Sequence, residues 1–181
     1  MLLLEADLGV WLDETEEQKV QRLRGLAQGG LNPIIAIGFP YSEAVRSVAA
    51  EFPGTKFAIV DGEAAGNNVS NLVFAEQEGG FLAGVAAGGR VMGAEGDEAR
   101  TADATLRDVV LTSIIKRVDT VVFDYLKAFS TGSAKSGPIV YDIKDHGFDY
   151  TTTGNQIDGI KARLDEMEQK IADGQIVVPS S

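Results

Sequence analysis

The sequence predicts an α/β protein, a three-layer α/β/α sandwich around a mostly parallel sheet. Three observations predict this class. Short apolar runs bounded by turn residues alternate with segments of helical periodicity along the 181 residues. The clearest runs are apolar throughout, as expected for strands buried on both faces of a parallel sheet. Hydrophobic residues make up 44% of the chain and charged residues 24%, which is the balance of a soluble protein with a buried core.

The predicted strands are short apolar runs between turn residues. The three clearest are "NPIIAIGF" (32–39), "KFAIVD" (56–61) and "SNLVFA" (70–75). Weaker runs predict strands at 90–95, 108–114 and 138–143. The opening "LLLEADLGVW" is a further candidate, with a ragged end. Because these runs alternate with helices, neighbouring strands are expected to be parallel.

The predicted helices follow from apolar spacing and from capping residues. Thr15 begins "TEEQ", a capping-box pattern in which two side chains each satisfy a backbone N–H group. Ser42 is predicted as the N-cap of a second helix, which ends before Pro53. Further helices are predicted at 78–89, 116–129 and 157–172. The stretch 94–108 has no clear periodicity, and we expect a long loop there.

Charge and composition exclude several functional classes. The formal net charge of −11 argues against nucleic acid and anionic membrane surfaces as partners, because both are recognised through clustered lysines and arginines. The chain has no cysteine, no phosphate-binding loop and no carboxylates at metal-ligand spacing, so we expect no cofactor and no metal. His146, the only histidine, is predicted to lie in an exposed turn. No apolar stretch is long enough to span a bilayer.

Aromatic and polar residues follow the predicted strands, at the edge where open α/β sheets bind ligands. Phe39 and Tyr41 follow the first strand and offer a flat apolar wall, and the helix that starts at Ser42 offers free backbone N–H groups. Asp61 follows the second strand and can accept hydrogen bonds from hydroxyl groups, and Glu95 follows a weaker strand. This set favours a neutral, polar, ring-bearing small molecule over a phosphate. The alternative, in which Ser42 only caps its helix and Asp61 only ends its strand, stays open.

Several stretches of the chain resemble the basic membrane protein family. The first lobe of that family is similar to "NPIIAIGFPYSEAV", "FPGTKFAIVDGE" and "NNVSNLVFAEQEGGFLAGVAA". Its C-terminal portion is similar to "DVVLTSIIKRVDTVVFDYLKAF", "GPIVYDIKDHGFDYTTTG" and "KIADGQIVVP". Members of the family are substrate-binding proteins of ABC transporters, related to the purine nucleoside receptor. The resemblance implies one lobe of a periplasmic-binding-protein type I fold, with a flavodoxin-like sheet.

The chain departs from the family in several places. The opening strand and loop, which supply ligand contacts in the family, are missing. A junction loop at 88–108 stands where the second lobe would be inserted, so we expect a single α/β lobe over 1–181. The lipoprotein cysteine is absent, and "MLLLEADLGV" lacks the basic segment of a signal peptide. We expect the gap left by the missing strand to be filled by 90–95, by 108–114, or by a strand exchanged with a second copy of the chain.

The resemblance also implies roles for three residues. Asp61 becomes a contact to the ribose or the base of a nucleoside. Glu95 becomes the altered counterpart of a ribose-binding aspartate, and Lys116 a polar contact from the returning hinge segment. These roles favour a ligand site over the alternative in which Asp61 only ends a strand.

We therefore expect a non-enzymatic solute-binding lobe of the nucleoside type. The ligand is expected to be a purine or other nucleoside, bound weakly or not at all. The resemblance implies an ABC permease as partner and an extracytoplasmic location, at the cell surface or in the periplasm. Two alternatives remain, a self-associating module that forms homo-oligomers and a small α/β enzyme with Asp61 or Glu95 as general base. The enzyme is disfavoured because the chain has no nucleophile elbow.

Overall fold

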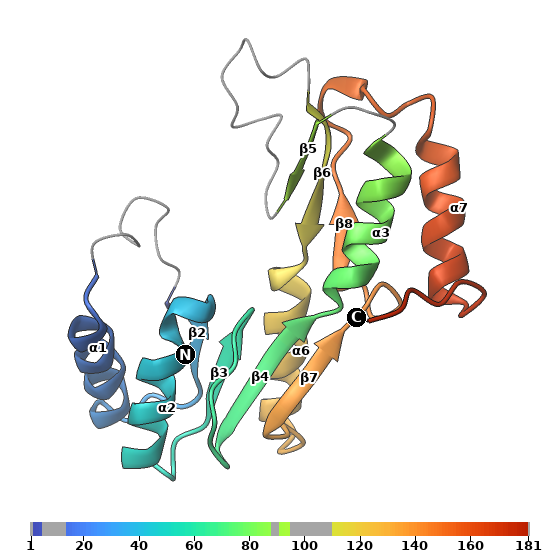
Figure 1. Ribbon diagram of the computed structural model, residues 1–181. Coiled ribbons are helices and arrows are strands. Elements are labelled where there is room, and N and C mark those ends of the chain that lie inside the picture. Colours follow the sequence, from blue (N-terminus) through green and yellow to red (C-terminus); the bar gives the residue numbers. More distant parts are fainter. Residues whose placement is uncertain (1, 5–13, 88–90, 95–109, 181) are drawn as a thin grey trace. The chain divides into compact units, whose positions relative to one another are not determined.

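The computed structural model describes residues 2–4, 14–87, 91–94 and 110–180 (Figure 1). Contacts between residues divide the chain into two compact units. Unit 1 comprises Met1–Val73 and Val121–Val140, and unit 2 comprises Phe74–Thr120 and Tyr141–Ser181. The sequence analysis treats the chain as one lobe, whereas the contacts gather in two groups. The expected junction loop at 88–108 lies outside the described residues, except for four that form a strand.

A five-stranded sheet forms the centre of unit 1, and its strands follow the order β1-β2-β3-β4-β7. Their bounds are β1 Leu2–Leu4, β2 Ile34–Ile37, β3 Phe57–Val60, β4 Val69–Phe74 and β7 Gly137–Tyr141. The pairs β1–β2, β2–β3 and β3–β4 are parallel, with Ile34 opposite Phe57 and Phe57 opposite Val69. The strands predicted from the three clearest apolar runs are therefore confirmed. The parallel sheet of the predicted α/β class is confirmed with them.

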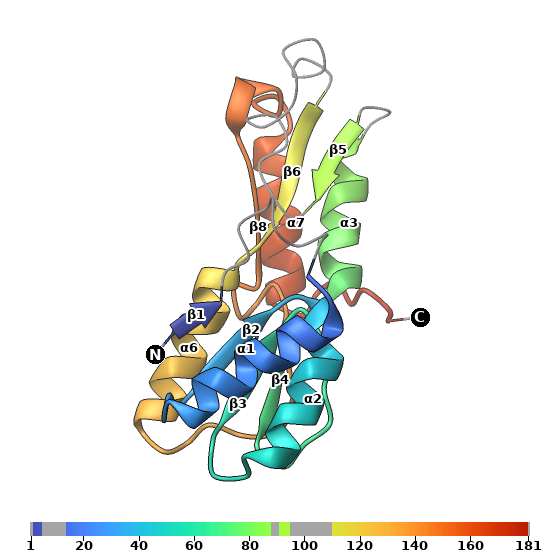
Figure 2. The same ribbon diagram turned by 90° about the vertical axis from the view of Figure 1, so that its left-hand side faces the viewer.

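Helices cover both faces of this sheet. Helices α1 (Glu16–Gln28) and α2 (Ser42–Glu51) lie on one face, and α6 (Val118–Ser130) lies against the other (Figures 1 and 2). The capping box predicted at Thr15 is present, with both of its hydrogen bonds. Side chains of α1, α2 and the strands form one buried cluster, which includes Leu23, Val45, Val48, Phe57 and Ile59.

The strand beside β2 in the sheet is β1, and neither of the two segments predicted to fill that place lies there. Residues 91–94 and 110–116 form β5 and β6, and both belong to a second sheet. The expectation that either of them fills the gap is therefore wrong. Strand β1, near the start of the chain, pairs with β2 instead. Because β2 has a neighbour on each side, strand exchange between copies loses the structural reason that suggested it.

Unit 2 is a smaller α/β arrangement. Its sheet has the order β5-β6-β8, with β5 (Val91–Ala94) parallel to β6 (Val110–Lys116) and β8 (Phe148–Tyr150) antiparallel to β6. Helices α3 (Glu76–Ala87) and α7 (Lys161–Ala172) pack against each other, and α3 also contacts β6. The apolar side chains between them include Ala86, Leu111, Ile157 and Leu164.

The sequence analysis missed β8 because three residues carry too little periodicity to separate a strand from a turn. The exposed turn predicted around His146 is confirmed, since this residue is exposed and has a positive φ of 56°. The turn leads directly into β8. Phe148 is the first residue of β8, and its ring meets that of Phe74 edge to face, with centroids 5.7 Å apart.

Candidate functional site

The carboxyl end of β2 presents one exposed aromatic ring. Gly38 follows the strand with φ at 96°, a backbone conformation that glycine adopts at little cost. Its N–H group donates to the carbonyl of Val60 at 2.7 Å, so the chain leaves the sheet only after this residue. A short 3-10 turn, Phe39–Tyr41, then leads into α2. Phe39 lies on this turn with 74% of its surface exposed.

The loop after β3 lies against the same turn. Asp61 has a positive φ of 55°, and its N–H group donates to the carbonyl of Leu72 at 2.9 Å. Gly62 follows, and a Cβ atom there would lie 3.0 Å from the Cα of Phe39 and 2.8 Å from a methyl of Ile59. Glycine at this position therefore lets the two loops approach closely. The structure thus brings Phe39 and Asp61 to one edge of unit 1, as the strand order predicts.

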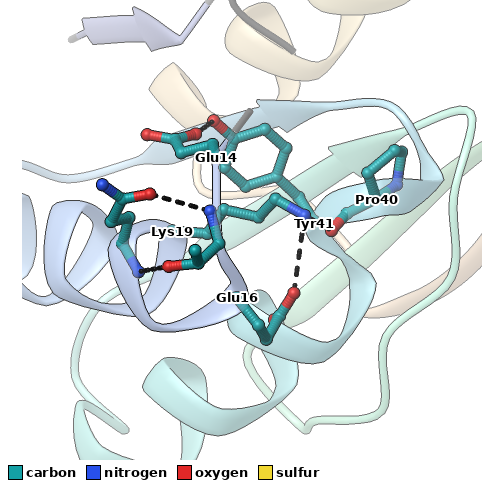
Figure 3. Close-up of polar contacts among 7 residues, drawn as sticks. Glu14, Glu16, Lys19, Pro40 and Tyr41 are labelled. Carbon is teal, nitrogen blue, oxygen red and sulfur yellow. Dashed lines mark hydrogen bonds and ion pairs between the residues drawn. The ribbon is translucent and has the colours of Figure 1, made fainter. Parts of the chain in front are cut away.

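Tyr41 lies differently from the expectation that it stands beside Phe39 as a second exposed ring. Only 2% of its surface is exposed, and it belongs to the buried cluster of unit 1. Its hydroxyl donates to Glu14 at 3.0 Å (Figure 3). Burial raises the pKa of the phenol, and the hydrogen bond to Glu14 raises it further, so the hydroxyl stays protonated and remains a donor. Tyr41 therefore holds the turn and does not form its outer wall.

The prediction that Ser42 caps α2 is wrong. Ser42 has helical dihedral angles and is the first residue of the helix, while Tyr41 occupies the cap position without a side-chain cap. The N–H group of Ser42 donates to the carbonyl of Phe39 within the 3-10 turn. The turn replaces the side-chain cap, because its own carbonyls satisfy the first N–H groups of the helix.

Lys19 of α1 and Glu14, which precedes the helix, hold the turn through contacts that the sequence pattern did not predict. Lys19 donates to the carbonyl of Pro40 at 2.9 Å and lies 5.8 Å from the centre of the Tyr41 ring (Figure 3). Glu14 accepts from Tyr41 and forms an ion pair with Arg22. These partners are 21 and 27 residues apart along the chain, so no local pattern links them.

Two predicted site residues remain, Glu95 and Lys116. Glu95 lies outside the described residues. Lys116 ends β6 in unit 2, where its ammonium pairs with Glu76 at 2.7 Å and lies 5.7 Å from the centre of the Phe74 ring. Its side chain is only 13% exposed. The resemblance implies that Lys116 contacts a ligand. In this structure its ammonium contacts protein groups, the Glu76 carboxylate and the Phe74 ring.

The edge of unit 1 presents groups that can bind a small molecule. The exposed ring of Phe39 offers a stacking surface, and Asp61 on the neighbouring loop is of a residue type that accepts hydrogen bonds from hydroxyl groups. Within the described ranges, no three histidine, aspartate or glutamate side chains gather as metal ligands would.

Comparisons with known proteins show similarity to one family over about half of the chain. Residues 4–91 match the family model described as ABC transporter substrate-binding protein PnrA-like. Basic membrane proteins A1 and A2 of Borrelia garinii subsp. bavariensis are 38% and 36% identical to this chain over 66 residues. Each match covers 34% of this chain and 20% of the relative, so it spans about a fifth of the curated relatives' length. These matches confirm the resemblance to the basic membrane protein family.

Solved structures show the same fold at low sequence identity. A transcriptional activator of the comK gene from Bacillus halodurans has a TM-score of 0.73 at 17% identity, and the match covers 92% of this chain and 87% of that one. An ABC transporter solute-binding protein from Aeropyrum pernix K1 has a TM-score of 0.65 at 15% identity, covering 93% and 83%. One from Conexibacter woesei has a TM-score of 0.69 at 17% identity, covering 91% and 85%.

Family and fold together support a part of an ABC transporter substrate-binding protein. The family consists of solute-binding proteins, which catalyse no reaction, and this agrees with the expectation that the chain is not an enzyme. Among the described residues, no helix combines the length and the apolar character that crossing a membrane requires.

Proposed function

We propose that unit 1 binds a nucleoside-type solute at the edge formed by the turn after β2 and the loop after β3, and that it does so weakly. The observation that carries the proposal is Phe39, a large aromatic ring with 74% of its surface exposed at the carboxyl edge of a parallel sheet. Open α/β sheets bind their ligands at this edge. Packing against the protein does not explain a large aromatic residue at this position, because most of the ring is in contact with water.

The chemistry of the edge matches a nucleoside in two respects. The ring of Phe39 offers a flat apolar face on which a base can stack, and stacking of this kind contributes about 1–3 kcal/mol per base. Asp61 offers carboxylate oxygens to the hydroxyls of a ribose. A phosphorylated ligand is disfavoured, because the chain carries a net charge of −11 and Asp61 would repel the phosphate.

The affinity is expected to be about millimolar or weaker. Small-molecule sites bury about 70–90% of the ligand surface, whereas an exposed ring covers one side of it. The cost of immobilising the ligand is unchanged, so the missing contacts reduce the favourable part of the binding free energy. Glu95 and Lys116 remain proposed contacts through the family resemblance alone, and Lys116 would have to exchange Glu76 for the ligand.

The partner and the location follow from the family. We propose an ABC permease as the partner of the whole protein and an extracytoplasmic location, because substrate-binding proteins of this family deliver solutes to a membrane transporter. Both proposals rest on the family resemblance.

Replacing Phe39 by Ala is expected to abolish detectable nucleoside binding. Loss of the stacking ring should weaken a millimolar complex about ten-fold or more. The measurement is an NMR titration with inosine, guanosine, adenosine and uridine, in which amide shifts of Gly38–Gly62 report on the edge. Phe123→Ala is the matched control, because this second exposed phenylalanine lies on α6 with 66% of its surface exposed.

Two results would contradict the proposal. Equal losses in Phe39→Ala and Phe123→Ala would show that the edge of the sheet is not the site. A submicromolar affinity of the unmodified chain would contradict the weak, one-sided binding.

A further inference from the structure

Lys19 is unusual among the charged residues on the helices of unit 1 because its cation is directed inward. Only 12% of its side chain is exposed, although it lies on a helix with a largely charged outer surface. Its ammonium has three neighbours: the carbonyl oxygen of Pro40 at 2.9 Å, the ring of Tyr41 with its centre at 5.8 Å, and a carboxylate oxygen of Glu16 at 3.5 Å (Figure 3). Removing a cation from water is costly unless such partners replace the water.

The ammonium of Lys19 contacts two residues of the 3-10 turn. Pro40 is the central residue of the 3-10 turn, and Tyr41 is its last residue. Tyr41 is also held from its other end, because its hydroxyl donates to Glu14 at 3.0 Å. Lys19 thus contacts the turn at the Pro40 carbonyl and at the Tyr41 ring, and Glu14 contacts it at the Tyr41 hydroxyl.

Phe39, by contrast, has little packing of its own. With 74% of its surface exposed, the direction of its ring is set mainly by the backbone of the turn. Gly38 before it has φ at 96°, and glycine restricts the backbone less than any other residue. The side chain of Tyr41, at the cap position of α2, makes no hydrogen bond to the helix. The side-chain contacts of Lys19 and Glu14 therefore add to two backbone restraints on the turn that carries Phe39, the hydrogen bond from Gly38 to Val60 and the close approach of Gly62.

We propose that Lys19 is a positioning residue for the ligand edge, and that it acts through Pro40 and Tyr41 to orient the ring of Phe39. The proposal rests on the proposed function, because Phe39 is the stacking surface there. A pre-oriented ring binds more tightly, since less conformational freedom is lost when the ligand arrives. Lys19 itself touches no ligand.

The experiment places a reporter at the ring. Phe39→Trp in a Trp11→Phe background makes the indole at position 39 the only tryptophan, because the chain contains one. The indole retains a stacking face, so this protein is expected to bind nucleosides as the unmodified chain does. Fluorescence anisotropy and acrylamide quenching then report the mobility and exposure of the ring without any ligand.

Lys19→Met is the informative variant, because it keeps the apolar stem and removes the donor. It is expected to lower the anisotropy of the indole and to weaken inosine binding about five-fold, as loss of one hydrogen bond of about 1 kcal/mol predicts. Lys19→Arg, which restores a donor and a cation, should recover part of both. Lys127→Met is the control for the charge change, because Lys127 is exposed in the last turn of α6, and it should change neither readout.

Each outcome decides the proposal. An unchanged anisotropy in Lys19→Met, or equal weakening in Lys127→Met, overturns it. If no variant binds any nucleoside, including the unmodified chain, the proposed function fails, while the anisotropy still decides whether Lys19 orients the ring. Should Lys19→Met fail to fold, Tyr41→Phe tests whether side-chain contacts to the turn orient the ring at position 39. This variant removes the hydrogen bond to Glu14, and it is expected to lower the anisotropy of the indole as well.

Discussion

Replacing Asn68 by Ala is expected to destabilise unit 1 by about 2–4 kcal/mol. The side chain of Asn68 is buried, with 8% of the residue exposed. Its amide nitrogen, which carries two hydrogens, lies within hydrogen-bond distance of three backbone carbonyls, those of Ala49 and Phe52 at 3.1 Å and that of Thr55 at 2.8 Å. These carbonyls lie at the C-terminal end of α2 and in the turn after it, where helical partners are lacking. Alanine would remove this donor from the buried bond to Ala49 and from the part-buried bond to Thr55, while the Phe52 carbonyl would keep the N–H group of Thr55.

Urea denaturation followed by circular dichroism measures this loss, and hydrogen exchange of α2 localises it. Asn68→Asp should destabilise the protein at neutral pH as well, because a carboxylate of the same size can only accept and would face carbonyl oxygens. The neighbouring Asn67→Ala is the matched control, since Asn67 is exposed and substitutions at such positions change stability by about 0.5 kcal/mol or less. Equal effects at the two positions would contradict the role assigned to Asn68.

Replacing Gly147 by Ala is expected to destabilise unit 2 by about 1–3 kcal/mol, the range found for overpacking. A Cβ atom at Gly147 would lie 2.9 Å from the carbonyl oxygen of Tyr141 and 3.0 Å from that of Asp142. Both contacts are with backbone atoms, so no flexible side chain can move aside. The backbone of Gly147 also donates to Asp142 at 2.8 Å and accepts from Arg117 at 2.9 Å. Any shift that relieves the contact would strain these two hydrogen bonds.

Hydrogen exchange resolved by mass spectrometry separates this effect from changes in unit 1. Gly84→Ala on α3 is the control, because a Cβ there meets nothing within 4 Å. It should stabilise the helix by about 0.5–1 kcal/mol, since alanine favours the helix more than glycine. If exchange in β6 and β8 is as slow in Gly147→Ala as in the unmodified chain, the close contact carries no cost and the prediction is wrong.

Local signals in the sequence were sufficient for most of the elements. The capping box at Thr15 needs only residues three positions apart, and both of its bonds are present. The three clearest apolar runs became β2, β3 and β4, because an uninterrupted apolar run is stable only where both of its faces are buried. The meeting of Phe39 and Asp61 at one edge follows from parallel pairing of β2 and β3, which alternation of strands and helices already predicts.

The exposure of individual residues could not be predicted in the same way. Phe39 and Tyr41 are both aromatic and two positions apart, and the sequence analysis placed both on the wall of the site. A 3-10 turn separates them, so that Phe39 is 74% exposed and Tyr41 only 2%. Nothing local distinguishes the two rings, because Tyr41 packs into the buried cluster of unit 1 and its hydroxyl donates to Glu14, 27 residues away.

The sequence by itself determined the α/β class, the positions of the main strands and helices, and the residues that follow β2 and β3 at the edge of the sheet. These properties depend on patterns a few residues long. Only the tertiary structure decided that β5 and β6 pair in a second sheet with β8, that β1 lies beside β2, and that Lys19 and Glu14 hold the turn at Phe39. Strand order and buried hydrogen bonds depend on which distant segments pack together, and that choice is made by the free energy of the whole core.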